Sequence, residues 1–234
     1  MIGILVILLI SSIILYAVER KTILVLGFTP ALRAVKYFLI GFTLLATLCA
    51  AVQLLTIWSA AGQWSINDAI LISRILRMLS WDATSVLTEE LIFRGALLYL
   101  LIRWIGSSKA VLISAIAFGV YHWFSFGILG YVVPMIVVFI GTGLMGYAWA
   151  LSYAKTGSIA LAFGMHLGWN FTHNTIFSKG PLGDGLLLIR VEEVVSSWIS
   201  LIGLCGIPIL VVLVVQFWIK DERRKDEFIE KNRS

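Results

Sequence analysis

Charged residues are scarce in this chain: only 13% of its 234 residues are Asp, Glu, Lys or Arg, whereas 60% are hydrophobic. An ordinary soluble domain carries about 25% charged residues. A soluble fold of this size cannot bury so much apolar surface, and a disordered chain needs the opposite balance. The composition therefore excludes both classes and indicates that lipid is the main solvent of the chain.

Cysteine and signal-peptide features are also scarce. The two cysteines, Cys49 and Cys205, lie in apolar runs, so we expect small buried side chains rather than a disulfide or a metal pair. The apolar segment 1–15 lacks the basic n-region with which a signal peptide starts, and no small-residue cleavage site follows it. We therefore expect a retained span. The net charge of +5 is explained by basic cytoplasmic loops, so we expect no nucleic-acid partner.

Long apolar runs predict an all-α, polytopic integral membrane protein with seven or eight transmembrane helices around a polar intramembrane cavity. Segment 66–79 mixes charged and apolar residues, so it is interpreted either as an interfacial amphipathic helix or as a short eighth span. We expect one membrane domain over 1–219, with a catalytic core at about 81–175, and a charged tail at 220–234 that is a solvated helix end or disordered. The seven expected spans are 2–18, 35–59, 81–104, 109–125, 131–154, 157–175 and 196–219.

The distribution of basic residues predicts the orientation. If the loop after the first span is cytoplasmic, the inside segments hold 13 of the 18 Lys and Arg residues, the outside segments hold 4, and Arg94 lies within a span. Positive residues collect in cytoplasmic loops. The bias favours a multi-pass protein of the cell membrane with its N-terminus outside and its C-terminus inside.

Polar residues inside the spans are the candidates for chemistry, because ionisable groups in a membrane are costly and usually functional. Three of the spans carry such clusters, and the clusters contain all three histidines of the chain. The clusters are Glu89, Glu90 and Arg94; His122; and His166, Asn170 and His173.

The first cluster predicts one compensated and one free carboxylate. Glu90 and Arg94 are four residues apart, so they share a helix face and can form an ion pair. Glu89 points about 100° away and cannot use the same partner as well. Alone, this pattern is also typical of a buried ion pair between helices, but the second glutamate favours a general base or acid.

The other two clusters also show spacings of four residues. Phe118 can pack beside the imidazole of His122, although a lone histidine near a span end is also typical of an interfacial residue. His166 and Asn170 would present two hydrogen-bond donors in one direction, as an oxyanion requires. Alternatively, these polar side chains would form hydrogen bonds between helices. Gly164 and Gly168 would let another helix come close. For His173 we expect a local hydrogen bond or an interfacial position.

Together the three clusters predict a hydrolytic site. Glu89 and His122 could hold and deprotonate a water molecule, while His166 and Asn170 could stabilise the tetrahedral oxyanion. No serine or cysteine with a neighbouring base stands out as a nucleophile, so direct attack by water is the simpler scheme.

These motifs resemble the family of CAAX proteases and bacteriocin-processing enzymes, also called the CPBP or Abi family. The resemblance rests on the patterns E-E-x-x-x-R, F-x-x-x-H and H-x-x-x-N, in this order on separate spans. It covers about 89–170. The residues that carry it are Glu89-Glu90-Leu91-Ile92-Phe93-Arg94, Phe118-Gly119-Val120-Tyr121-His122 and His166-Leu167-Gly168-Trp169-Asn170.

The resemblance implies an all-α intramembrane glutamic endopeptidase that needs no cofactor. It implies Glu89 and His122 as the pair that activates water, His166 and Asn170 as the oxyanion site, and Glu90 and Arg94 as supporting residues. The substrate would be a lipidated or membrane-associated protein or peptide. The short loops resemble those of bacterial or archaeal members, so a prenylated CAAX substrate does not follow.

Three other classes of protein remain open. Glutamates and histidines could bind Zn²⁺ in a metal-dependent membrane protease, although no H-E-x-x-H motif is present. The same cavity could bind a peptide without cleaving it, as in an immunity protein. Intramembrane Glu and His also serve proton relays in transporters, but paired breaks in helices, which are typical of transporters, are not evident.

Overall fold

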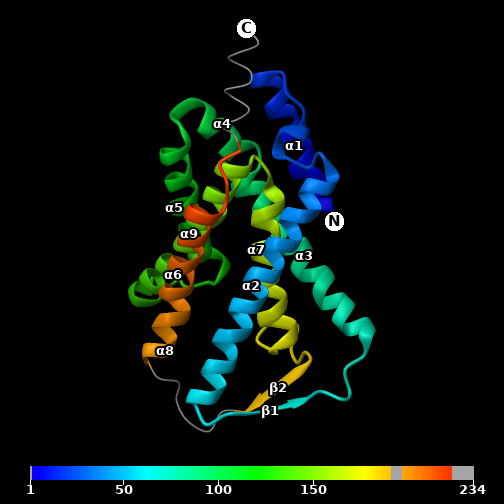
Figure 1. Ribbon diagram of the computed structural model, residues 1–234, viewed down its shortest axis with the longest axis vertical. Coiled ribbons are helices and arrows are strands. Elements are labelled where there is room, and N and C mark those ends of the chain that lie inside the picture. Colours follow the sequence, from blue (N-terminus) through cyan, green and yellow to red (C-terminus); the bar gives the residue numbers. More distant parts are fainter. Residues whose placement is uncertain (1, 191–196, 223–234) are drawn as a thin grey trace.

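The fold is a bundle of helices with a small sheet at one end, seen in a computed structural model that describes residues 2–190 and 197–222 (Figure 1). The expected tail at 220–234 falls largely outside the described residues, since only 220–222 are described. The α-helices are α1 (Ile2–Glu19), α2 (Ala31–Ser59), α3 (Ile72–Arg94), α4 (Ala96–Ile105), α5 (Ser107–Ser125), α6 (Val132–Thr156), α7 (Ile159–Phe171), α8 (Ser197–Leu201) and α9 (Ile207–Trp218).

Short irregular turns accompany these helices. A 3₁₀ turn, η1 (Ile23–Leu26), precedes α2. A π-helical turn, η2 (Thr172–Ile176), continues α7, and a second one, η3 (Ile202–Gly206), joins α8 to α9. The spans expected at 157–175 and 196–219 therefore each contain a π-helical turn, which hydropathy alone does not reveal.

The span expected at 81–104 is wrong as a single helix, because the chain breaks at Gly95 between α3 and α4. A Cβ atom added to Gly95 would lie 2.0 Å from the carbonyl oxygen of Leu91. Only glycine tolerates such a close approach to backbone. The break separates the polar helix α3 from the short apolar helix α4.

Segment 66–79 does not form the separate helix that both of its interpretations expected. Ile66 ends a strand, β1 (Gln63–Ile66), and 72–79 forms the first part of α3. Strand β1 pairs antiparallel with β2 (Leu187–Arg190), and Gln63 lies opposite Arg190. The purely helical fold class therefore needs this correction, since a partner so distant along the chain leaves no local sequence pattern.

Four helical stretches in the described part of the chain are long and apolar enough to cross a membrane. They are Ile2–Glu19, Ile23–Ser59, Val132–Thr156 and Trp198–Trp218. The expected number of seven or eight is not confirmed. Helix α3 carries the charged residues of the site, and α7 has only 13 residues.

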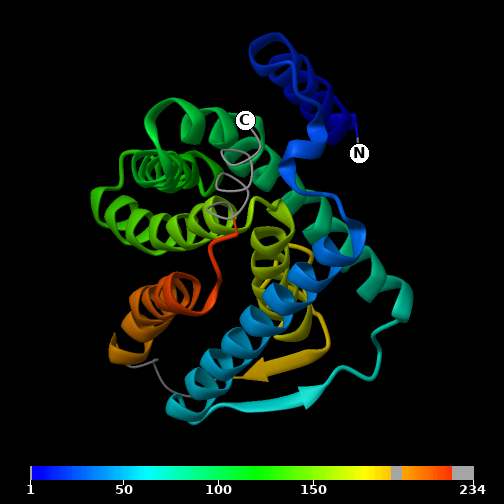
Figure 2. The same cartoon turned by 45° about the horizontal axis from the view of Figure 1, so that its top comes forward.

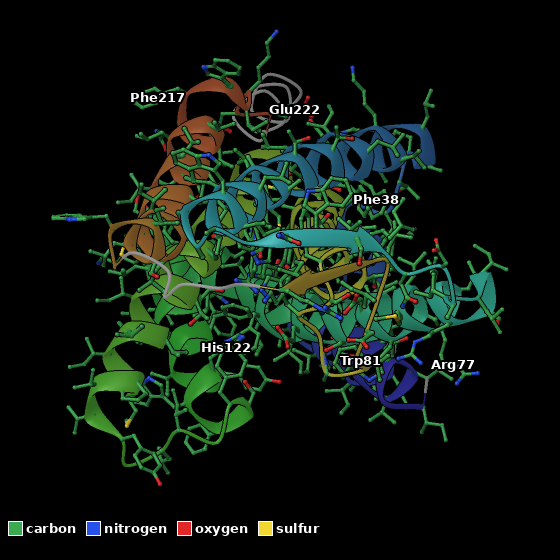
Figure 3. The ribbon with its side chains drawn as sticks, turned by 90° about the horizontal axis from the view of Figure 1, so that it is seen from below. Phe38, Arg77, Trp81, His122, Phe217 and Glu222 are labelled. Atoms are coloured by element: carbon green, nitrogen blue, oxygen red, sulfur yellow. The ribbon has the colours of Figure 1, made fainter. Side chains whose placement is uncertain are left out.

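Helix α7 lies inside the bundle against α2 (Figure 2). Added Cβ atoms at Gly164 and Gly168 would lie 2.2 and 2.3 Å from the carbonyl oxygens of Phe38 and Phe42. On α2, a Cβ atom at Gly41 would lie 2.5 Å from the carbonyl oxygen of Leu161. The two helices thus meet backbone to backbone, and the prediction that Gly164 and Gly168 admit another helix is confirmed.

Several basic residues join chain segments at the end of the bundle that is opposite the sheet (Figure 1). Arg103 lies 3.8 Å from Glu19, and Arg33 forms an ion pair with Glu222. The Nζ atom of Lys155 donates to the carbonyl oxygen of Val215 at 3.0 Å, near the C-terminus of α9. The loops that were expected to be cytoplasmic therefore gather at one end.

Candidate active site

Glu90 and Arg94 form the ion pair that their spacing predicts, with 3.3 Å between Glu90 Oε1 and Arg94 Nη1. Both side chains are fully buried. A second guanidinium nitrogen, Nη2, donates to the carbonyl oxygen of Gly146 at 3.1 Å. The pair therefore ties α3 to α6 in the centre of the bundle.

Aromatic rings surround the Arg94 guanidinium. Its carbon atom lies 4.3 Å from the ring centroid of Phe118, 5.2 Å from that of Trp149 and 5.7 Å from that of Phe93. Such contacts stabilise a desolvated cation. A Cβ atom at Gly146 would lie 3.0 Å from the Phe118 ring and 3.1 Å from Arg94 Nη2, so a larger residue there would have to shift both side chains.

His166 on α7 lies between the two glutamates of α3. Its Nδ1 atom is 2.8 Å from Glu90 Oε1, and its Nε2 atom is 3.8 Å from Glu89 Oε2. The ring stacks on Trp149, with 4.0 Å between centroids and 17° between planes. Because Nδ1–H donates to Glu90 and Trp149 covers one ring face, the direction of Nε2 toward Glu89 is fixed.

The two glutamates differ in their access to the surroundings. The Glu90 side chain is 0% exposed, whereas that of Glu89 is 16% exposed. The Oε2 atoms of both glutamates lack a hydrogen-bond partner in the described part of the chain, so exposure is what distinguishes the two side chains. Glu89 is thus the carboxylate that a water molecule or a substrate can reach.

His122 on α5 is buried, and its Nδ1–H donates to the carbonyl oxygen of Phe118 at 2.8 Å. That bond leaves the lone pair of the neutral ring on Nε2. The Phe118 ring packs on His122 with centroids 4.4 Å apart, as the spacing predicts, and also lies 6.0 Å from His166. Phe118 therefore lies beside both imidazoles, although no hydrogen bond joins His122 to Glu89 among the described residues.

Asn170 and His173 have different surroundings on the last turns of α7 and on η2. Asn170 is half-buried and its side chain makes no hydrogen bond within the described residues, so its amide can bind another group. His173 Nδ1 lies 3.2 Å from Asn174 Oδ1, which is the local hydrogen bond expected for it. His173 thus contacts its chain neighbour rather than the glutamates.

The site combines two kinds of polar group. An imidazole nitrogen that carries a proton donates, and a carboxylate oxygen accepts. The Nε2 atom of His166 and the carboxylate of Glu89 lie 3.8 Å apart, so the two groups can contact one bound molecule.

Sequence reasoning missed two features of this region. Trp149 orients His166, but an aromatic residue in an apolar span gives no signal of such a role. Asp82 is buried on α3 and accepts a hydrogen bond from Asn174 at 2.7 Å. It lies within the expected span 81–104, so its charge was a signal that could have found it.

The described residues, 2–190 and 197–222, include no group of three or more His, Cys, Asp or Glu side chains arranged to hold a metal ion. Glu89, Glu90 and His166 lie together, but Glu90 already binds Arg94 and His166. A resident metal would have to compete with both of these partners.

These elements define a helical membrane protein with a buried Glu, His and Arg site. A family model, that of type II CAAX prenyl endopeptidases of the Rce1-like kind, matches residues 71–172, a little under half of the chain. This segment holds all three motifs, so the resemblance to the CAAX protease family, a family of membrane endopeptidases, is confirmed. No curated protein and no solved structure matches the chain.

Proposed function

We propose that this protein is an intramembrane endopeptidase that hydrolyses a peptide bond with water activated by Glu89. The observation that carries the proposal is the contrast between the two glutamates. Glu90 is fully buried and binds Arg94 and His166 at 3.3 and 2.8 Å, whereas the Glu89 side chain is 16% exposed and lies 3.8 Å from His166. The family match over 71–172 supports the same class of reaction.

In the proposed reaction, Glu89 and the Nε2 atom of His122 hold a water molecule between them. Glu89 takes a proton from this water as its oxygen attacks the carbonyl carbon of the substrate. The carbonyl oxygen becomes an oxyanion in a tetrahedral intermediate. Protonated Glu89 then returns the proton to the leaving nitrogen, so the carboxylate is regenerated when the peptide bond breaks.

His166 and Asn170 supply the donors for the oxyanion. They are one helical turn apart on α7, and Asn170 has no competing partner among the described residues. His166 donates through Nε2 when both of its ring nitrogens carry protons, while Nδ1–H stays on Glu90. Such fixed donors stabilise developing charge because no reorganisation is needed.

The substrate class follows from the setting of the site. Glu89 lies among apolar helices, so we propose a substrate that is anchored in or at the bilayer, either a lipidated protein or a membrane-associated peptide. We also propose that α3 with α4, α5 and α7 cross the membrane together with the four apolar stretches, as in a multi-pass protein of a bacterial or archaeal plasma membrane. Glu90, Arg94 and Phe118 support this site.

The experiment compares cells that make equal amounts of wild-type protein, Glu89→Gln or Glu19→Gln. Peptide termini in membranes and medium are identified by mass spectrometry. Glu19→Gln is the control, because this carboxylate lies at the end of α1. We expect the wild type and Glu19→Gln to share a set of termini that Glu89→Gln lacks. Identical termini in all three strains would contradict the proposal.

A second candidate is a membrane protein that binds a peptide without cleaving it, such as an immunity protein. The observation that favours it is the extensive packing of the site, where Trp149 and Phe118 cover both His166 and Arg94. In that case a host phenotype would persist in Glu89→Gln and would be lost in Gly146→Leu, whose side chain would displace Phe118 and Arg94.

A further inference from the structure

A second polar layer lies between α3 and η2, on the sheet side of the catalytic glutamates. Asp82 lies seven residues before Glu89 on α3, which puts both carboxylates on one side of the helix, about 10 Å apart along its axis. Asn174 lies eight residues after His166 on the facing segment and donates from Nδ2 to Asp82 Oδ1 at 2.7 Å. The same two segments are thus joined twice by polar contacts.

Asp82 is buried in a way that requires an explanation. The residue is 1% exposed, and its one well-formed hydrogen bond comes from Asn174. The hydroxyl of Thr175 lies close enough to interact with the same carboxylate, but no well-formed bond reaches the Oδ2 atom in the described part of the chain. Burying a carboxylate with so few partners is costly, so this position is expected to serve a purpose beyond packing.

The segment that Asp82 contacts is the π-helical end of α7. Such turns often occur at functional sites, because they shift the side chains of a helix relative to its regular spacing. The Asn174 Oδ1 atom also accepts from His173 Nδ1 at 3.2 Å, so both the oxygen and the nitrogen of this amide are hydrogen-bonded. The side chain of Asn170, one turn earlier, has no hydrogen bond among the described residues, so its position depends on how this helix is held.

The following loop is folded back tightly onto the same turn. The amide of Leu186 donates to the carbonyl oxygen of Thr175 at 2.8 Å, and a Cβ atom on Gly185 would lie 1.9 Å from that oxygen. A Cβ atom on Gly180 would lie 2.5 Å from the Cβ of Asn174. The contact between Asp82 and Asn174 is therefore the point where α3, the end of α7 and the loop before β2 meet.

We propose that Asp82 is a positioning residue that acts through Asn174. It fixes the π-helical end of α7 and thereby holds His166 and Asn170 opposite Glu89. This role rests on the proposed function of the Glu89 site. A displacement of about 1 Å at a catalytic group can reduce a rate by about 10²-fold, so a contact two turns away can matter for turnover.

Substitutions at positions 82 and 174 separate the effect of the hydrogen bond from the effect of the Asp82 charge. Asparagine at position 82 can still accept from Asn174, so Asp82→Asn keeps the contact and loses only the charge. Asn174→Asp instead places two carboxylates against each other and removes the donor. The double variant, Asp82→Asn with Asn174→Asp, restores one donor facing one carboxylate in the reverse direction.

The experiment measures kcat and KM of the four purified proteins on a peptide that contains a cleavage site found with the wild type. We expect kcat of Asp82→Asn to stay within about threefold of the wild type, and kcat of Asn174→Asp to fall by about 10²-fold with KM little changed. The double variant should recover most of the loss. A folded but inactive Asp82→Asn, or a double variant without recovery, would overturn the proposal.

A second readout needs no turnover. A cysteine is introduced at Asp184, in the exposed part of the loop, and its rate of modification by a polar maleimide is measured in all four backgrounds. Asn174→Asp should raise this rate and the double variant should return it to the wild-type value, whereas equal rates would overturn the proposal.

Folding of the variants is the remaining control. If Asn174→Asp does not fold, the double variant should fold, and its failure to do so would equally overturn the proposal. A wild type without any turnover would refute the proposed function but leave this readout intact.

Discussion

Adjacent carboxylates on one helix receive different surroundings because successive helical residues point about 100° apart. Glu90 binds Arg94 on its own helix, α3, and His166 on α7. Glu89 faces His166 at a longer distance and stays partly exposed. One carboxylate is therefore held by contacts within the protein, and the other is the one that we propose transfers protons.

Arg94→Ala is expected to lower the free energy of unfolding by about 3–5 kcal/mol, because it leaves the carboxylate of Glu90 buried without its cation. Thermal unfolding in detergent measures the effect. Arg103→Ala is the control, since the Arg103 side chain is 57% exposed and exposed pairs contribute little. A stable and inactive Arg94→Ala would instead assign Arg94 a part in the reaction.

Asn170→Ala is expected to lower kcat by about 10²–10³-fold, the usual effect of removing one oxyanion donor. The unfolding temperature should change little, because the Asn170 amide makes no hydrogen bond within the described residues. Kinetics on a cleaved peptide, together with thermal unfolding, test both statements. An unchanged kcat would mean that Asn170 serves helix packing alone.

Among the elements, α7 depends on glycines for its close contact with α2. Gly164→Ala is expected to destabilise the protein by about 1–3 kcal/mol, the usual cost of overpacking, because its Cβ would lie 2.2 Å from the backbone oxygen of Phe38. Gly3→Ala on α1 is the matched control, since a Cβ there meets nothing within 4 Å. Equal unfolding temperatures for the two variants would contradict this account of the contact between α2 and α7.

Sequence reasoning located these elements unevenly. Apolar runs predicted α1, α2, α5 and α6 to within a few residues, because a helix in lipid needs a continuous apolar stretch. The same reasoning merged α3 with α4, since a glycine inside an apolar run does not by itself reveal a break. The pairing of β1 with β2 depends on a distant partner and could not be predicted.

The contacts of the site were likewise predictable only where they lie within one helix. Spacing of four residues predicted the ion pair of Glu90 with Arg94 and the packing of Phe118 on His122, because both are contacts within one helix. The position of His166 between the glutamates is a contact between helices, which spacing cannot define. The catalytic roles of Glu89, His122, His166 and Asn170 stay predictions.

For the whole molecule, the gathering of basic residues at one end predicts that this end is cytoplasmic. Alkaline phosphatase fused after Ser234 should be inactive, and a fusion after Leu129, between α5 and α6, should be active, because this enzyme folds only outside the cytoplasm. A fluorescent protein at the two positions should give the opposite pattern. Reversed activities would show that the sheet end faces the cytoplasm.

The most direct test of the central claim is the rate of peptide-bond cleavage by purified Glu89→Gln in lipid nanodiscs, on a peptide cut by the wild type. Glutamine preserves the size of the side chain but cannot take a proton from water. The account predicts loss of turnover with an unchanged unfolding temperature and unchanged binding of the peptide. A Glu89→Gln protein that cleaves at the wild-type rate would contradict activation of water by Glu89.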